Sequence, residues 1–156
     1  MDWVRPAGLD IEVLRGIRGP SAPIEALLAR IEDHLARRQG YVAFSGGKDS
    51  LVVLDLARRV DPQVPVVFFD SGLEYPQTYP YLEELATRWR LNLHIVDADP
   101  PLLTLLTHGG RWDHHAPIHD HGADAIHEAL ISRPAATAHR DHGPGELWGV
   151  RAGESA

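Results

Sequence analysis

Residues 41–50 read Tyr-Val-Ala-Phe-Ser-Gly-Gly-Lys-Asp-Ser, so that two glycines and a lysine follow a short apolar run. The run at 41–44 is typical of a buried β-strand, and residues 51–60 are apolar on most sides, like a helix that packs on a sheet. A strand that turns through glycines into a helix lets the backbone approach an anion, and the first N–H groups of the helix point at it. We therefore expect residues 45–50 to bind phosphate groups.

The side chains of this loop suit the same task. Lys48 is the only lysine among fifteen basic residues, and lysine supplies a compact charge on a flexible stem. Ser45 and Ser50 add hydroxyl donors. Asp49 falls in the first helical turn, where a carboxylate is favourable and could also approach a bound cation such as Mg²⁺. The loop is not a Walker A motif, because Val42 occupies the place of its first glycine and Asp49 follows the lysine.

Around the loop, helical and strand patterns alternate along the chain. Apolar spacing predicts strands at 41–44, 64–69, 91–96 and 146–150, and helices at 24–35, 51–60 and 82–89. Such alternation implies parallel strands joined by right-handed crossovers. We expect an α/β fold, a Rossmann-like three-layer α/β/α sandwich with a mostly parallel twisted sheet. Strand 41–44 should be central, with 64–69 on one side and 146–150 on the other. Ligands of such sheets bind beyond the carboxyl ends of the strands.

The chain of 156 residues has the length of one domain. We expect a single nucleotide-binding domain over residues 1–156, with an N-terminal arm at 1–20. Residues 108–145 are rich in His, Gly, Pro and Ala, and show one helical patch around 126–130. Their apolar content is too low to offset the entropy of ordering, so we expect 108–145 to be the least ordered segment, or to be ordered by a partner or a second copy of the chain.

Composition excludes several classes of protein. The chain has no cysteine, which excludes disulfides, thiolate metal sites and Fe–S clusters within it. A net charge of −7 makes a broad nucleic-acid surface unexpected. No apolar run approaches the ~20 residues of a membrane helix, and the first residues lack the pattern of a signal peptide. We therefore expect no membrane association and a cytoplasmic location.

Histidines and tryptophans in the second half allow two interpretations. Six histidines fall between residues 108 and 127, but their spacing matches no known ligand pattern, and a biased polar loop is simpler than a metal site. Trp112 and Trp148 are interpreted as packing groups rather than as platforms for stacked bases.

Three motifs in order resemble one family. The 45–50 loop resembles the PP-loop of the adenine nucleotide alpha hydrolase-like (HUP) superfamily, which includes ATP pyrophosphatases, tRNA-thiolation enzymes and phosphoadenosine phosphosulfate (PAPS) reductases. Residues 68–78, Phe-Phe-Asp-Ser-Gly-Leu-Glu-Tyr-Pro-Gln-Thr, are similar to a strand-end motif of the reductase branch. Residues 149–155, Gly-Val-Arg-Ala-Gly-Glu-Ser, are similar to its later Gly-aliphatic-Arg segment. The resemblance covers about residues 22–155.

The resemblance implies an adenine nucleotide, ATP or a relative, with Mg²⁺ as its cation. Backbone near Phe44 and Phe69 would hold adenine, and Arg151 would reach the phosphates with bidentate donors. The implied binding residues are Phe44, Ser45, Gly46, Gly47, Lys48, Asp49, Ser50, Phe69, Asp70, Ser71, Gly72 and Arg151. The implied catalytic residues are Lys48, Asp49 and Arg151, with Asp49 near the metal ion.

Three functions compete at this point. The first is cleavage of ATP to AMP and pyrophosphate, as in adenylation chemistry. The second is a reductase-like protein that binds a sulfonucleotide, PAPS or adenosine phosphosulfate (APS), and lacks its own catalytic cysteine. The third is a nucleotide-binding module without turnover. Two observations favour this third function: few general bases lie near the motifs, and the sequence ends soon after Ser155. Because reductases of this family use a cysteine, we expect this chain not to reduce a sulfonucleotide by itself.

Overall fold

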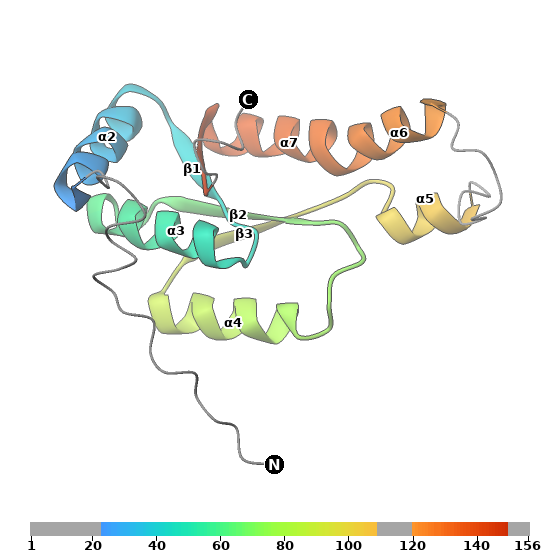
Figure 1. Ribbon diagram of the computed structural model, residues 1–156, viewed down its shortest axis with the longest axis horizontal. Coiled ribbons are helices and arrows are strands. Elements are labelled where there is room, and N and C mark those ends of the chain that lie inside the picture. The colour runs from blue at the N-terminus through green and yellow to red at the C-terminus, as the bar shows by residue number, and fades with distance from the viewer. Residues whose placement is uncertain (1–22, 109–119, 150–156) are drawn as a thin grey trace, which may run out of the picture.

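The computed structural model describes residues 23–108 and 120–149. Its centre is a four-stranded sheet in the order β3-β2-β1-β4, in which all neighbouring strands are parallel (Figure 1). The strands are β1 (Gly40–Ala43), β2 (Pro65–Asp70), β3 (Asn92–Asp97) and β4 (Gly145–Trp148). The α/β fold with a parallel sheet is therefore confirmed, as is the place of β1 between β2 and β4.

Helices cover both faces of the sheet. Figure 1 shows α3 (Lys48–Val60) and α4 (Thr78–Trp89) on one side of the strands and α7 (Arg133–His142) on the other. Helix α2 (Ile24–Arg37) packs against α3. The remaining helices are α5 (Leu102–His108), α6 (Asp120–His127) and the π-helix η1 (Glu128–Ser132). The chain thus forms the expected three layers.

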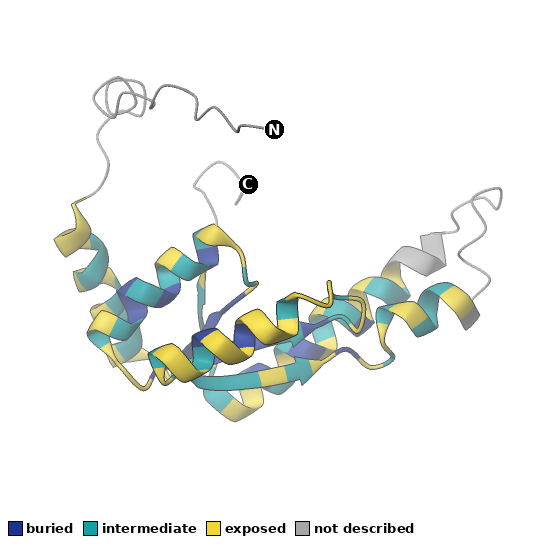
Figure 2. Ribbon diagram, turned by 90° about the horizontal axis from the view of Figure 1, so that it is seen from below, coloured by how far each residue is buried: buried dark blue, intermediate teal, exposed yellow. Residues whose placement is uncertain are grey.

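The core is divided by the sheet into two apolar clusters. Side chains alternate between the faces of a strand, so Val42 and Phe44 pack toward α3 and α4, where Leu54, Val66, Phe68 and Leu82 are also buried. Tyr41 and Ala43 point to the other face and pack with Val67 and Ala138 of α7. In Figure 2 the buried residues accordingly gather where the helices meet the sheet, and the outer faces of the helices are exposed.

The structure contains more helix after β3 than the sequence predicted. The α5 helix was not predicted, and the single patch expected around 126–130 is part of helices that continue from 120 to 142. Within residues 124–142 the buried residues are small, namely Ala129, Pro134 and Ala138, so this part of the chain buries no stripe of large apolar residues. The expectation of low order in 108–145 stays a prediction. The arm at 1–20 lies outside the described residues.

One close approach holds β4 against β1. Gly40 is paired with Gly145, and a Cβ atom on Gly40 would lie 1.8 Å from the carbonyl oxygen of Gly145. Only glycine allows this contact.

Within the described ranges, no helix is both long enough and apolar enough to cross a membrane.

We predict that Gly40→Ala lowers the free energy of unfolding by about 3 kcal/mol, because the added methyl group forces β4 away from β1. Urea denaturation followed by circular dichroism measures this change. Gly47→Ala is the matched control, since its Cβ would meet nothing nearer than the Ser45 hydroxyl at 3.4 Å. Equal stability of the two variants would contradict the packing argument.

Candidate functional site

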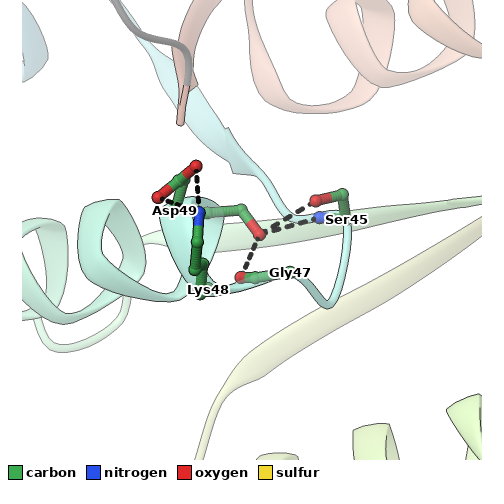
Figure 3. A network of polar contacts seen from close by, with 5 residues as sticks. Ser45, Gly47, Lys48 and Asp49 are labelled. Atoms are coloured by element: carbon green, nitrogen blue, oxygen red, sulfur yellow. Dashed lines mark hydrogen bonds and ion pairs between the residues drawn. The ribbon is translucent and has the colours of Figure 1, made fainter.

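The loop between β1 and α3 is closed by its two serines. The Ser45 and Ser50 hydroxyl oxygens lie 3.0 Å apart, and the Ser50 hydroxyl donates to the carbonyl of Gly47 at 2.9 Å (Figure 3). The Ser45 amide donates to the same Ser50 oxygen at 3.3 Å. Gly46 has φ 73°, a left-handed conformation that favours glycine. These contacts fix the loop on the first turn of α3, where the early N–H groups have no acceptor within the helix.

Lys48 and Asp49 lie side by side at the start of α3. The Lys48 ammonium is 2.9 Å from one carboxylate oxygen of Asp49 and 3.0 Å from the other (Figure 3). The Lys48 side chain is 75% exposed. Ion pairs this exposed contribute little to stability, so the ammonium can turn toward an incoming anion at small cost.

The loop after β2 is held by hydrogen bonds of its own side chains. The buried carboxylate of Asp70 accepts from the Gly72 amide at 2.7 Å and from the Tyr79 hydroxyl at 3.3 Å. The hydrogen bond to Asp70 raises the pKa of Tyr79. The Ser71 hydroxyl donates to Glu74 at 2.7 Å. Asp70 therefore shapes the turn, and Ser71 and Glu74 brace it.

A pocket of about 570 Å³ lies at the carboxyl edge of the sheet, a size typical of small-molecule sites. Its walls are the ends of β1, β2 and β4, the 45–50 loop, and the helices η1 and α7. The lining residues are Ala43, Phe44, Ser45, Ser50, Phe69, Ser71, Leu130, Ile131, Ala135, Glu146, Trp148 and Gly149.

The pocket brings together five residues that the sequence singled out. Phe44, Ser45, Ser50, Phe69 and Ser71 line it. The other described candidates lie in the same two loops without lining it: Gly46, Gly47, Lys48, Asp49, Asp70 and Gly72. Arg151 lies outside the described residues.

The sequence did not single out the far wall of the pocket. Leu130, Ile131 and Ala135 come from η1 and α7, and Glu146 comes from β4. Trp148, interpreted above as a packing group, lines the pocket and is 49% exposed. That interpretation is corrected, because a side chain in the core would be covered. Trp112 lies outside the described residues.

Gly149 brings the end of β4 against the 45–50 loop. A Cβ at this position would lie 2.6 Å from the backbone nitrogen of Ser50, so the backbone after β4 touches the first turn of α3. The Gly of the 149–155 motif therefore has a packing role that the resemblance alone did not reveal.

Glu146 is the acceptor at the centre of a hydrogen-bond network beside the pocket. Its Oε1 accepts from the Tyr41 hydroxyl at 2.6 Å and contacts Nε2 of His139, and its Oε2 accepts from Nε1 of Trp148. Burial raises the pKa of Glu146, but the hydrogen bonds from Tyr41, Trp148 and His139 outweigh this, and the pKa is lowered. Burial, together with the bond to Glu146, raises the pKa of Tyr41. Glu146 is thus held as a carboxylate.

Metal-binding side chains do not gather in the part of the chain that the structure describes. No three His, Asp or Glu side chains there could hold a metal ion together. Asp49, the candidate Mg²⁺ residue, supplies one carboxylate. His114, His115 and His119 lie outside the described residues.

We predict that Glu146→Gln lowers the free energy of unfolding by about 1–3 kcal/mol at pH 7, because an amide nitrogen would face donors that now meet a carboxylate. The pKa of Glu146 is lowered by folding, so its contribution is present above the ordinary value of 4.5 and lost as the pH falls through the folded-state pKa. The difference between wild type and variant should therefore shrink in acid.

Denaturant titrations from pH 7 to pH 3.5 measure this difference. Glu83→Gln, an exposed position on α4, is the matched control and should differ little from wild type throughout. A difference for Glu146→Gln that does not change with pH would contradict the role given to its charge.

Comparisons with known proteins agree with this geometry. Residues 39–120 match the model of the phosphoadenosine phosphosulfate reductase domain. The chain is 30% identical over 120 residues to phosphoadenosine 5′-phosphosulfate reductase of Photobacterium profundum, covering 74% of this chain and 45% of that protein. It is 41% identical over 58 residues to the Alteromonas mediterranea protein of that name, covering 37% and 23%. The chain spans less than half the length of these curated relatives.

Two solved structures share the fold. The PAPS reductase of Candida auris has a TM-score of 0.57 at 20% identity, covering 88% of this chain and 72% of that one. The NH3-dependent NAD synthetase of Campylobacter jejuni has a TM-score of 0.53 at 13% identity, covering 80% and 53%. Both have the adenine nucleotide alpha hydrolase-like fold. Because the matched residues 39–120 make up just over half of the chain and contain both loops of the site, the chain belongs to the phosphoadenosine phosphosulfate reductase domain family.

Proposed function

We propose that the chain binds a sulfonucleotide, PAPS or APS, in the pocket at the carboxyl edge of the sheet. The observation that carries this proposal is the pocket of about 570 Å³ that reaches the Ser45 and Ser50 hydroxyls at the start of α3. A helix N-terminus with the Ser45 hydroxyl and the exposed ammonium of Lys48 beside it is suited to phosphate groups.

The remaining lining suits a nucleoside. Phe44 and Phe69 stand at the ends of two adjacent strands, and Leu130 and Ile131 face the pocket from η1. The side chains of Phe69, Leu130 and Ile131 offer apolar contacts to a flat purine ring, while the backbone near Phe44 and Phe69 would hold its polar edge. Arg151, two residues beyond Gly149, is proposed to reach the phosphates.

The names of the relatives favour a sulfonucleotide over ATP as the ligand. Cleavage of ATP to AMP and pyrophosphate stays the alternative, with Lys48, Asp49 and Arg151 as its catalytic residues. Mg²⁺ usually keeps several waters and takes one or two carboxylates besides phosphate oxygens. Asp49 would supply such a carboxylate, and the Lys48 ammonium would then have to break its ion pair with Asp49.

The proposal separates binding from reduction. Reduction of a sulfonucleotide needs a thiolate that attacks its sulfur atom. These 156 residues contain no cysteine and one methionine, whose thioether forms no thiolate. The thiol would therefore come from outside these 156 residues, for example from a partner protein, and this chain would present the nucleotide to it.

We predict that PAPS or APS binds to the wild type and that Lys48→Ala weakens binding about tenfold, since one charged contact to phosphate is lost. Calorimetric titrations with PAPS, APS, ATP and AMP test this. Arg88→Ala is the control: it also removes one positive charge, from an exposed ion pair with Glu84 on α4, and should bind like wild type. Absence of binding by the wild type to all four nucleotides would refute the proposed function.

We also predict that the purified chain releases no sulfite from PAPS in the presence of reduced thioredoxin, because it has no thiolate to form the covalent intermediate. Sulfite is measured against a reaction without protein. Stoichiometric sulfite that disappears in Lys48→Ala would show that reduction does not need a cysteine of this chain. Release of pyrophosphate from ATP and Mg²⁺, lost in the same variant, would support the alternative function instead.

A further inference from the structure

Along the sheet, Glu146 lies several residues back from the 45–50 loop. In the sheet register Glu146 is paired with Tyr41 and Trp148 with Ala43. Ser45 follows Tyr41 by four residues, which is roughly 13 Å along an extended strand. Both Ser45 and Glu146 line the pocket, so a nucleotide whose phosphates lie on the loop would direct its nucleoside toward Glu146.

The carboxylate of Glu146 retains capacity for a further hydrogen bond. A carboxylate offers about four acceptor positions. Among the described residues three donors approach it: Tyr41 and His139 at Oε1, and Trp148 at Oε2. One acceptor position therefore remains on Oε2, the oxygen that holds the half-exposed indole of Trp148. The Glu146 side chain is 21% exposed and borders the pocket.

The surroundings decide which kind of group would occupy this position. Leu130, Ile131 and Ala135 line the pocket with apolar surface, and a carboxylate in such surroundings interacts strongly with a donor and repels an anion. The carboxylate thus accepts from a neutral N–H or O–H group and disfavours a phosphate or sulfate at its end of the pocket.

We propose that Glu146 is a specificity-determining residue whose remaining acceptor position on Oε2 binds an N–H or O–H donor of the nucleoside. This inference rests on the proposed function, since it needs a nucleotide in this pocket. Two groups of adenosine have the required chemistry: the exocyclic amine of the base and a ribose hydroxyl. In either case Glu146 orients the ligand, with its nucleoside at β4 and its phosphates at the loop.

Calorimetric titrations of the wild type with ATP, ITP, 2′-dATP and 3′-dATP test the proposal, because these ligands share the triphosphate. ITP replaces the amine with a carbonyl, and each deoxynucleotide removes one hydroxyl. We expect the analogue that lacks the recognised donor to bind at least tenfold more weakly than ATP. Weaker binding of ITP would identify the amine as the recognised donor, and weaker binding of one deoxynucleotide would identify the hydroxyl that it lacks.

In Glu146→Gln the dissociation constants of ATP and of the discriminated analogue should differ by less than threefold. If the amine is the recognised donor, the preference should reverse toward ITP, because the amide nitrogen donates to a carbonyl. If Glu146 had a purely structural role, the variant would bind all four ligands more weakly by the same factor, and the ratios of their dissociation constants would not change. Tyr41→Phe is the matched control: it removes one donor from Oε1 but keeps the carboxylate, so the discrimination should remain.

The outcomes separate this inference from the proposed function. If no nucleotide binds to the wild type in either set of titrations, the proposed function fails and this inference with it. If ATP binds but all analogues bind within threefold of it, the inference is overturned, and the proposed function is judged separately by the binding of PAPS and APS. Discrimination that survives in Glu146→Gln also overturns it. Should that variant fail to fold, equal binding of ATP and its analogues by the wild type still overturns the inference.

Discussion

The parallel pairing of β1 with β4 is the constraint on which the site depends. It places Tyr41 beside Glu146, two residues that are 105 positions apart in the chain, and it puts Gly149 against the first turn of α3. The strand pair in turn depends on the contact of Gly40 with Gly145, which leaves no room for a side chain. Without this pairing, the 45–50 loop would keep its local shape but would lose one wall of the pocket.

The two faces of the sheet differ in how fully they are packed. On the α3 and α4 face, fully buried residues such as Val42, Leu54 and Val66 form the larger cluster, and burying a side chain of this type contributes about 1.5–3 kcal/mol. On the α7 face the cluster is smaller, and the adjoining space is the pocket. A polar network around Glu146 is tolerable there because each of its side chains has a partner, and the larger cluster on the opposite face offsets the cost of burying it.

Sequence patterns predicted those parts of the fold that depend on local spacing. The strands at 41–44 and 64–69, the glycine loop between them and the parallel order around β1 followed from apolar runs and from the alternation of elements. The loop residues Ser45 and Ser50 were recognisable because glycines and a helix start surround them. Helix α7 and the extent of the helical segment around the 126–130 patch were missed because the buried residues there are alanines and a proline, and a stripe of small residues has little periodic signal. Glu146 was missed because its importance arises from Tyr41 and His139, which only the tertiary fold brings to it.

The pairing of Lys48 with Asp49 would affect the rate at which an anionic ligand reaches the proposed site. The carboxylate of Asp49 lies 2.9 Å from the Lys48 ammonium, so at longer distances the two charges largely cancel and the 45–50 loop is close to electrically neutral. The chain as a whole carries a net charge of −7, which repels a polyanion during diffusional approach. Encounter is therefore governed by short-range contacts rather than by long-range attraction. Added salt, which screens the repulsion over a Debye length of about 10 Å at 0.1 M, would speed association, the opposite of its effect on a site with a positive field.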